Sequence, residues 1–268
     1  MTAAVPPDVA ALLDDLATGL GGLPMEPVGA YVFGSLVLLD GFDPPTSDID
    51  VVVALPTAPD AAQVNAIRDL HKGLARRHQL ARRLDVGYVT LRALRGDGDE
   101  AIPRPTFRDA LYRPDGGADL NAVTRWVVRE RGIRLLGPPP AALGLPVTWD
   151  DVLGAMRYNL ADYWAPWQSV LALPRLLRQE ELVWTVATLC RILVTVRDGE
   201  IVTKRAAVDR LRTNAPDQWH PLLESVAAIQ RGHTEPLGPL ARLGRARTAR
   251  RFVRWSRQTG LTALDAPR

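Results

Sequence analysis

The sequence lacks the features of secreted and membrane-spanning proteins. It contains a single cysteine, Cys190, which excludes a disulfide within the chain. The apolar residues around Cys190 predict a buried, unreactive thiol rather than a nucleophile. No stretch of apolar residues is long enough to span a bilayer, and no basic-then-apolar leader opens the sequence. We therefore expect a cytoplasmic protein with no membrane partner.

An excess of charge of one sign is also missing. The chain has 33 basic and 30 acidic side chains and a formal net charge of +3. A dedicated nucleic-acid binder usually concentrates a basic excess, so no nucleic-acid partner is expected. Lysine is scarce, since only Lys72 and Lys204 occur, and all seven tryptophans follow residue 125. The two halves of the chain therefore differ in composition.

The pattern of apolar residues predicts two domains. Helices are expected over 7–20, 60–79 and 119–131, strands over 28–33, 49–55 and 84–91, and a loop over 95–118. The proline-rich stretch Pro138–Pro146 is the predicted linker. Helical patterns follow over 149–163, 179–198, 202–213, 218–230 and 236–258. The expected fold class is α+β, with a mixed sheet and flanking helices in residues 1–140 and an α-helical bundle in residues 147–268.

Two aspartates open the second predicted strand. Asp48 and Asp50 are two residues apart, so both side chains should point to one face of the sheet. Two neighbouring carboxylates repel each other unless a cation neutralises them, and Mg²⁺ commonly takes one or two carboxylates together with substrate phosphates. Upstream, Gly34 and Ser35 follow the first strand, where glycine permits a close backbone approach to a phosphate.

A third carboxylate lies inside the third predicted strand. Asp85 stands between Leu84 and Val86 and should share a strand face with Gly87 and Val89. An acid among apolar strand residues is costly unless it has a partner or faces a site. Beside Asp48 and Asp50 it could complete a metal site or take the proton of an attacking hydroxyl. The combination of the three acids with Gly34–Ser35 indicates a site for chemistry.

These motifs resemble a known enzyme family. Phe33–Gly34–Ser35 with Ser47–Asp48–Ile49–Asp50 is similar to the active-site motif of nucleotidyltransferases of the DNA polymerase β superfamily. The runs 132–138, 189–193 and 199–204 resemble the streptomycin/spectinomycin adenylyltransferases, which transfer AMP from Mg-ATP to a hydroxyl of an antibiotic. The similarity covers about residues 25–260. It implies an N-terminal nucleotidyltransferase domain and a C-terminal helical domain that closes the active-site cleft.

The resemblance assigns roles in the first half of the chain. Asp48, Asp50 and Asp85 would hold magnesium, as two ions. Gly34, Ser35 and Ser47, with Asp48 and Asp50, would bind the nucleotide. Asp85 would also be the catalytic base, at a position where the family typically has Glu. Aspartate is one methylene shorter than glutamate, which favours a catalytically weak, nucleotide-binding regulatory homologue as an alternative.

The resemblance also assigns roles outside the metal motif. Arg191 and Lys204 match the residues that reach the ATP phosphates, and lysine is a common phosphate contact. Glu181 matches an acidic residue that binds the acceptor in the family. Tyr112 falls near an aromatic residue that also binds it. Because the acceptor is cationic, we add three acceptor-binding candidates whose acidic or aromatic side chains suit a cation: Glu180, Trp164 and Trp167. Core packing is the competing interpretation of both tryptophans.

The sequence thus predicts an ATP- and Mg²⁺-dependent transferase that acts as a monomer on an aminoglycoside or aminocyclitol and gives antibiotic resistance. Trp184 stands where the family has a polar residue near Glu181, so the acceptor is left open. Another small molecule or a protein side chain is the alternative acceptor.

Overall fold

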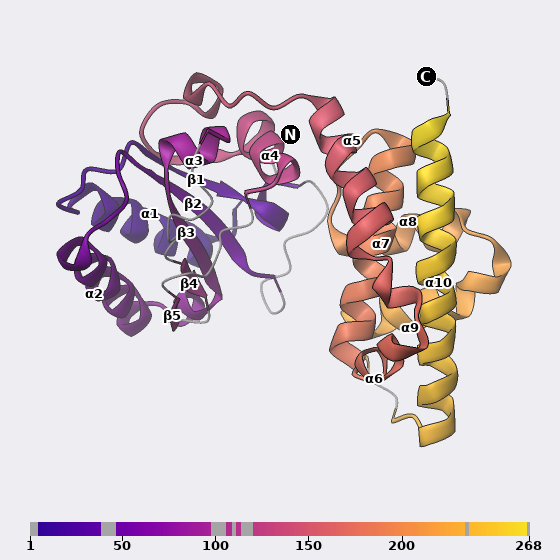
Figure 1. The fold of residues 1–268 in the computed structure, drawn as a ribbon. Coiled ribbons are helices and arrows are strands. Elements are labelled where there is room, and N and C mark those ends of the chain that lie inside the picture. Colours follow the sequence, from indigo (N-terminus) through magenta and orange to yellow (C-terminus); the bar gives the residue numbers. More distant parts are fainter. Residues whose placement is uncertain are drawn as a thin grey trace. The chain divides into compact units, whose positions relative to one another are not determined.

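The computed structural model describes residues 5–38, 47–97, 106–108, 111–113, 120–233 and 236–266. Contacts divide the chain into two compact units, Met1–Trp149 and Asp150–Arg268, here called unit 1 and unit 2 (Figure 1). In the part of the chain that the structure describes, no helix is both long and apolar enough to cross a membrane.

Unit 1 is built on a mixed sheet. Its strands are β1 (Gly29–Phe33), β2 (Ile49–Leu55), β3 (Leu84–Thr90), β4 (Thr106–Arg108), β5 (Leu111–Arg113) and β6 (Ile133–Leu136). The order across the sheet is β5-β4-β3-β2-β1-β6. Strands β2 and β3 are parallel and joined through a helix, as a parallel pair requires, while the other pairs are antiparallel. The parallel pair therefore lies in the middle of the sheet.

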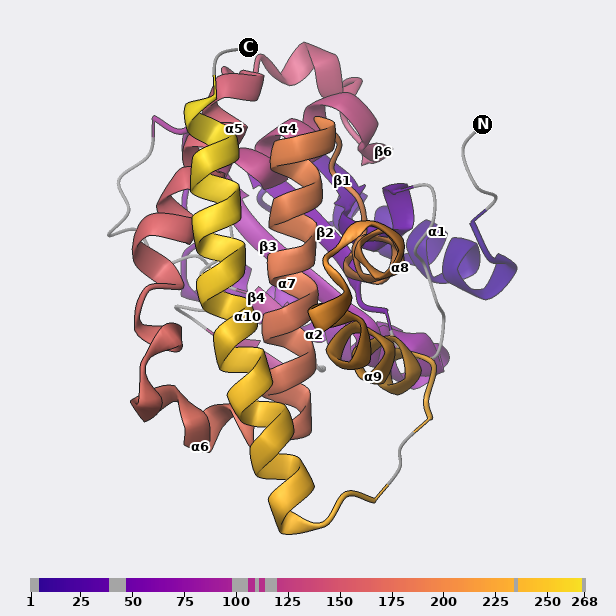
Figure 2. The same ribbon diagram turned by 90° about the vertical axis from the view of Figure 1, so that its right-hand side faces the viewer.

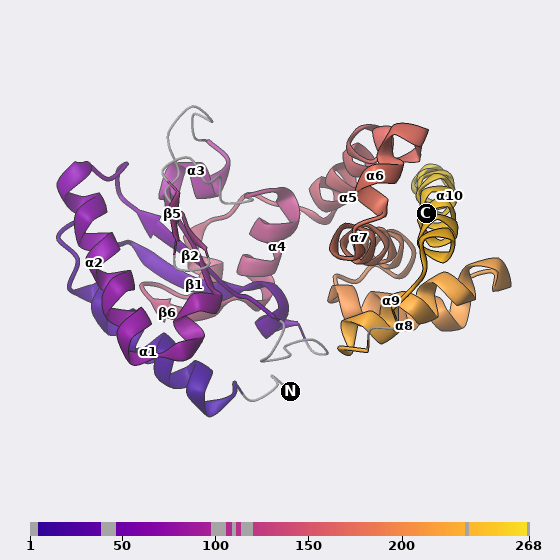
Figure 3. The ribbon, with the colours of Figure 1, turned by 90° about the horizontal axis from the view of Figure 1, so that it is seen from below.

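Helices cover both faces of this sheet (Figure 3). They are α1 (Pro7–Gly21), α2 (Ala61–Arg77), α3 (Leu91–Arg95) and α4 (Ala122–Arg131), with 3-10 turns η1 (Gly34–Val37), η2 (Gln79–Arg83) and η3 (Pro140–Leu143). On one face Val51 of β2 and Val86 of β3 pack in a core with α1 and α2. On the other face Val52 and Val89 pack with α3 and α4. The alternation along β2 and β3 follows the period of two that the sequence predicts.

The core under α2 contains a buried histidine. His71 Nε2 lies 2.9 Å from the hydroxyl of Tyr88, and the imidazole stacks on Phe107 with ring centroids 3.9 Å apart. Burial lowers the pKa of His71 to about 3 and raises that of Tyr88. Because its pKa is about 3, the imidazole is neutral in the folded protein at neutral and mildly acidic pH.

This histidine should make the protein sensitive to acid. Between the ordinary pKa of 6.5 and the folded value of about 3, the unfolded chain binds a proton that the folded chain does not. The free energy of unfolding should therefore fall as the pH drops, by up to about 1.4 kcal/mol per pH unit. Denaturant titrations at a series of pH values give the free energy of unfolding at each pH. Its decrease with falling pH should be less steep in His71→Gln than in the wild type. The variant of the exposed His233, His233→Gln, should keep the wild-type slope; equal slopes in all three proteins would contradict this assignment.

Part of unit 1 differs from the sequence prediction. The expected loop 95–118 contains β4 and β5, and β6 was not predicted because these strands are only three or four residues long. The predicted linker 138–146 packs against unit 1. The Tyr31 hydroxyl donates to the Pro138 carbonyl at 2.8 Å and Arg95 Nε donates to the Leu143 carbonyl at 2.8 Å. Leu143 joins the α3/α4 core, and the boundary between the units falls after Trp149.

Unit 2 is helical. Its helices are α5 (Trp149–Tyr158), α6 (Leu173–Leu176), α7 (Gln179–Asp198), α8 (Lys204–Asn214), α9 (His220–Gln230) and α10 (Pro239–Asp265). A π-helical turn η4 (Asn159–Tyr163) continues α5, and 3-10 turns are η5 (Pro166–Gln168), η6 (Val170–Ala172) and η7 (Asp217–Trp219). Helix α7 lies between α10 and the pair α8 and α9 (Figure 2). It carries the buried Cys190, whose thiol pKa is raised by burial, as its apolar surroundings predict.

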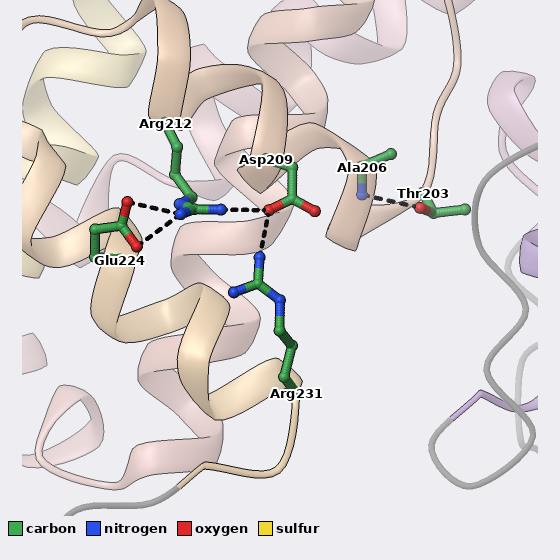
Figure 4. A network of polar contacts seen from close by, with 6 residues as sticks. All are labelled: Thr203, Ala206, Asp209, Arg212, Glu224 and Arg231. Carbon is green, nitrogen blue, oxygen red and sulfur yellow. Dashed lines mark hydrogen bonds and ion pairs between the residues drawn. The ribbon is translucent and has the colours of Figure 1, made fainter.

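An arginine–carboxylate network joins α8 to α9 (Figure 4). Arg212 donates to both carboxylate oxygens of Glu224 at 2.7 Å and to Asp209 at 2.9 Å. Arg231 donates to the same oxygen of Asp209 at 3.0 Å. These hydrogen bonds raise the pKa of Arg212, with Glu224 as the main cause. The network ties the two helices that carry Lys204 and Gln230 into one rigid pair.

Candidate functional site

Gly34 lies directly against the side chain of Asp50 in the predicted site. Gly34 follows β1 in the left-handed region with φ of 70°, and Phe33 pairs with Asp50 across β1 and β2. A methyl group on Gly34 would lie 1.9 Å from Oδ2 of Asp50. Both the backbone conformation and this close approach require glycine. Glycine at position 34 thus leaves the space that the Asp50 carboxylate occupies.

The sheet register brings Asp50 beside Asp85. They are Cα partners in the parallel ladder of β2 and β3, and neighbouring strands lie about 4.8 Å apart. Each alternates with residues of the α1/α2 core, so both point to the α3/α4 face of the sheet. Both are half-buried, and the exposed Asp48 immediately precedes β2. One face of the sheet therefore holds two adjacent carboxylates near the start of its central strands, with a third carboxylate two residues upstream of Asp50.

The carboxylate oxygens near the start of β2 and β3 suit magnesium. Carboxylate oxygens are hard ligands, and Mg²⁺ typically takes one or two of them and completes its shell with water and substrate phosphates. Among the described residues, no group of three or more His, Cys, Asp or Glu side chains is gathered to hold a metal ion. The pair Asp50 and Asp85, at one register position, fits an ion that shares its coordination with a phosphate. Magnesium binding by Asp48, Asp50 and Asp85 remains a prediction.

Two serines flank the carboxylates. Ser35 is half-buried in the 3-10 turn η1, and its carbonyl accepts a hydrogen bond from the Leu38 amide at 3.3 Å. Ser47 lies just before β2, and Arg83 Nη1 donates to its carbonyl at 3.3 Å. Both serines thus lie at the ends of the connection between β1 and β2, Ser35 two residues after β1 and Ser47 two residues before β2. Their contact with a triphosphate remains a prediction.

Replacing Gly34 tests how strongly this site depends on one backbone position. Gly34→Ala should lower the free energy of unfolding by about 1–2 kcal/mol, because a side chain is strained at positive φ. Activity should fall further, by about 100-fold, because Asp50 is pushed from its place. The matched control is Gly73→Ala on α2, where a methyl group meets nothing within 4 Å. Steady-state rates and denaturant titrations measure both effects; a Gly34→Ala enzyme with wild-type rates would contradict this role.

Tyr112 is not brought together with these carboxylates. Its ring lies against Phe107 with centroids 5.3 Å apart, under the guanidinium of Arg68 at 4.1 Å. Tyr112 packs on the α1/α2 core, whereas Asp50 and Asp85 point to the other face of the sheet. The structure therefore accounts for this ring by packing within unit 1.

In unit 2, Lys204 is placed by a helix cap. It is the first residue of α8, and the preceding Thr203 accepts a hydrogen bond at Oγ1 from the Ala206 amide at 3.1 Å (Figure 4). Thr203 is a preferred N-cap residue because its hydroxyl satisfies one of the free amides of the first turn. The cap fixes the backbone of the first turn of α8, and with it the direction in which the half-buried side chain of Lys204 leaves the helix.

Lys204 lines a hollow of about 290 Å³ between α7, α8 and α9. Glu180, an acceptor-binding candidate, lines the same hollow from the first turn of α7. The complete lining is Gln179, Glu180, Val183, Trp184, Ala187, Lys204, Ile229 and Gln230. A predicted nucleotide contact and a predicted acceptor contact therefore share one concave surface of unit 2.

Arg191 lies on the same side of α7 as this hollow. Arg191 is one helical turn beyond Ala187, and residues four apart lie on one helix face. Glu181 is the neighbour of Glu180 on the first turn, and both Glu181 and Arg191 are half-buried. Helix α7 thus carries predicted acceptor contacts at its start and a predicted phosphate contact two to three turns later.

Three tryptophans of unit 2, Trp164, Trp167 and Trp184, form one cluster. The ring centroid of Trp164 lies 5.1 Å from that of Trp167 and 5.1 Å from that of Trp184. Trp164 is 0% exposed and Trp167 is 7% exposed. A fully buried ring offers no face to a ligand, so Trp164 is a core residue, as the competing interpretation states. Half-buried Trp184 is the member of the cluster that reaches the hollow.

Sequence reasoning missed some of the lining residues. Gln179 and Gln230 carry no signal of their own, because isolated glutamines on amphipathic helices are typical of solvated faces. Gln230 ends α9, and only the packing of α9 against α7 and α8 shows that it faces the hollow. Trp184 stood out in the sequence only as a departure from the family pattern.

Comparisons with known proteins agree with the observed architecture. Residues 159–245 match the family model described as the aminoglycoside adenylyltransferase C-terminal domain. Among solved structures, the chain is similar to the spectinomycin adenyltransferase AAD(9) from Enterococcus faecialis, determined with ATP and spectinomycin. That match has a TM-score of 0.63 and 14% identity, and covers 91% of this chain and 99% of that one. No match was found among curated proteins.

These matches bear on three of the sequence predictions. The resemblance to the aminoglycoside adenylyltransferases is confirmed, by the family match in unit 2 and by the fold match over most of the chain. The predicted α+β fold, a mixed sheet with flanking helices followed by a helical bundle, is confirmed as well. The two matches also confirm the predicted enzyme class, a nucleotidyltransferase. The individual site residues stay predictions.

Proposed function

We propose that this chain transfers AMP from ATP to a hydroxyl of an aminoglycoside or aminocyclitol antibiotic of the streptomycin or spectinomycin type, and so protects a bacterium from the drug. One observation carries the proposal: Asp50 and Asp85 stand at one register position of β2 and β3, with Asp50 held against Gly34. The family match over residues 159–245 and the ATP in the similar solved structure support the choice of reaction.

The carboxylates have separate roles in this reaction. Asp48 and Asp50 would hold magnesium, as two ions, which when bound neutralise charge on the triphosphate and orient it. Asp85 accepts the proton of the acceptor hydroxyl, whose oxygen attacks the α-phosphorus as pyrophosphate leaves. Because β2 and β3 are fixed by the sheet ladder, the base and the nucleotide-binding carboxylates keep their spacing without rearrangement. The catalytic base Asp85 thus lies on a strand that its neighbours in the sheet hold in place.

Two cations of the chain would also contact the phosphates of the nucleotide. Lys204 lines the hollow, Arg191 lies one turn beyond its lining residue Ala187 on the same face of α7, and both suit contact with phosphate oxygens. The Thr203 cap fixes the start of α8, and the hydrogen bonds of Asp209 and Arg212 join its later turns to Arg231 and to Glu224 of α9. Such preorganised charge lowers the reorganisation needed during phosphoryl transfer.

Drug susceptibility tests the proposal in cells. Bacteria that express the chain should grow at raised concentrations of streptomycin, spectinomycin or both, while cells that express Asp50→Asn should stay sensitive. Protection that is equal with the two proteins, or absent for every aminoglycoside and aminocyclitol tried, would overturn the assignment of the acceptor class. Release of pyrophosphate with another small-molecule or protein acceptor would then identify the alternative acceptor.

A further inference from the structure

Arg83 joins the starts of the two strands that carry the candidate metal ligands. It is the last residue of η2, directly before β3, and its Nη1 donates to the Ser47 carbonyl at 3.3 Å. Ser47 in turn directly precedes Asp48. Ile49 and Leu84 are the first Cα partners of the parallel ladder. The guanidinium of Arg83 therefore reaches from the start of β3 to the start of β2, where the carboxylates lie.

The short turn η2 gives Arg83 a fixed base. Ala81 and Leu84, on either side of it in the chain, are buried in the α1/α2 core, and the Leu84 amide donates to the Ala81 carbonyl to close the turn. The neighbouring Arg82 is exposed, whereas Arg83 is half-buried. Core packing thus holds the backbone of Arg83 in place, and its side chain turns toward β2 instead of extending into solvent.

The hydrogen bond of Arg83 acts on the peptide unit that leads into Asp48. The Ser47 carbonyl and the Asp48 amide belong to one planar unit, so a hydrogen bond to the oxygen restrains the rotation of the whole plane. The ladder holds Asp50 and Asp85, whereas Asp48 lies just outside it because β2 begins at Ile49. The Arg83 contact therefore supplies a restraint on Asp48 that the ladder does not.

The charge of Arg83 suits the same position. A guanidinium is permanently protonated, and the three carboxylates repel one another in the absence of a cation. A positive charge beside the Asp48 peptide reduces that repulsion before magnesium binds. The hydrogen bond to Ser47 uses a backbone oxygen, so it occupies none of the carboxylate oxygens that the metal would need.

We propose that Arg83 is a positioning residue of the nucleotide site, which holds the Ser47–Asp48 peptide so that Asp48 can bind magnesium together with Asp50. Arg83 acts through Asp48 and touches neither the metal nor the nucleotide. The proposal rests on the proposed function for the role of the carboxylates in binding Mg-ATP. It adds the residue that orients the candidate ligand lying outside the sheet ladder.

Calorimetric titration of the full chain with Mg-ATP, without an acceptor, tests this role apart from catalysis. Arg83→Met removes the donor and the charge and should weaken binding about 10- to 100-fold, the usual effect of losing a group that orients a metal ligand. Arg83→Lys restores a charged donor and should recover most of that loss. The matched control is Arg82→Met on the same turn, which should bind as the wild type does. Wild-type affinity in Arg83→Met would overturn the proposal.

The melting temperature of each variant without ligand shows whether it is folded. If Arg83→Met is not folded, the neutral and shorter Arg83→Gln takes its place in the same comparison, with the same expected loss of affinity. A folded variant that binds Mg-ATP normally but melts earlier would mean that Arg83 serves stability alone, and would overturn the positioning role.

A double-mutant cycle with Asp48→Asn identifies the group through which Arg83 acts. If that group is Asp48, Arg83→Met should weaken Mg-ATP binding by less than about twofold once Asp48→Asn is present, because coupled residues are not additive. A guanidinium that contacts the triphosphate directly would give its full loss in both backgrounds. That result would overturn the proposal.

The two proposals fail in different ways. AMP transfer to a drug by a chain whose Arg83→Met variant binds Mg-ATP as tightly as the wild type overturns the positioning role and leaves the proposed function standing. Weaker binding in Arg83→Met that disappears in the Asp48→Asn background, without AMP transfer to any aminoglycoside or aminocyclitol, supports the positioning role and contradicts the proposed function.

Discussion

Asp50→Asn should abolish AMP transfer while leaving the fold intact. The substitution keeps the size of the side chain that lies against Gly34 but removes its charge. A neutral amide is a poor magnesium ligand, and a metal's stabilisation of phosphoryl transfer amounts to several kcal/mol. We therefore expect the rate of pyrophosphate release to fall by about 1,000-fold or more. The rate with saturating Mg-ATP and acceptor is the measurement.

Magnesium-dependent stability provides the control for Asp50. Ligands that bind only the folded state raise the melting temperature, so magnesium with ATP should raise that of the wild type and not that of Asp50→Asn. The matched variant Asp69→Asn changes an aspartate that pairs with Lys72 on exposed α2. It should keep wild-type rates. An Asp50→Asn enzyme that retains a tenth or more of the wild-type rate would rule out Asp50 as an essential metal ligand.

Asp85→Asn should also cost about 100- to 10,000-fold in rate, the usual contribution of a general base. This carboxylate is half-buried on β3, in register with Asp50. Loss of the base should lower the maximal rate while the binding of Mg-ATP, measured by calorimetry, changes far less. Asp50→Asn should weaken that binding. The two carboxylates are thereby distinguished by which step they serve.

Asp85→Glu tests whether the shorter acid limits the enzyme. It restores the residue that the resemblance leads one to expect, and the longer side chain reaches one methylene further. Activity equal to or above the wild type would agree with a base at this position. A rate with Asp85→Asn that equals the wild-type rate would remove Asp85 from the chemistry.

The sequence predicts the central part of unit 1 well. The strands β1, β2 and β3 are rich in β-branched and apolar residues, and the period of two places Asp85 on the face of β3 opposite Leu84 and Val86. The residue pattern of neither strand shows that Asp50 and Asp85 are paired. The pairing follows from the parallel ladder, which aligns Asp50 with Asp85 and not with a residue one position away.

Other features depended on packing that no local pattern encodes. The prolines of 138–146 suggest a linker, yet Leu143, Leu145 and Val147 bury their side chains in the α3/α4 core. Arg129 Nη1 also donates to the Val147 carbonyl, which ties the segment to α4. The short β4, β5 and β6 have too few residues to show a period. Trp164 and Trp184 look alike in sequence, and only packing assigns one to the core and the other to the hollow.

Mass spectrometry of the acceptor tests the central claim most directly. The purified chain is incubated with Mg-ATP and spectinomycin or streptomycin, alongside Asp50→Asn under the same conditions. The account predicts an acceptor whose mass has increased by one AMP group, formed together with pyrophosphate by the wild type and not by the variant. Unmodified acceptors after prolonged incubation with a folded, ATP-binding wild-type enzyme would contradict it.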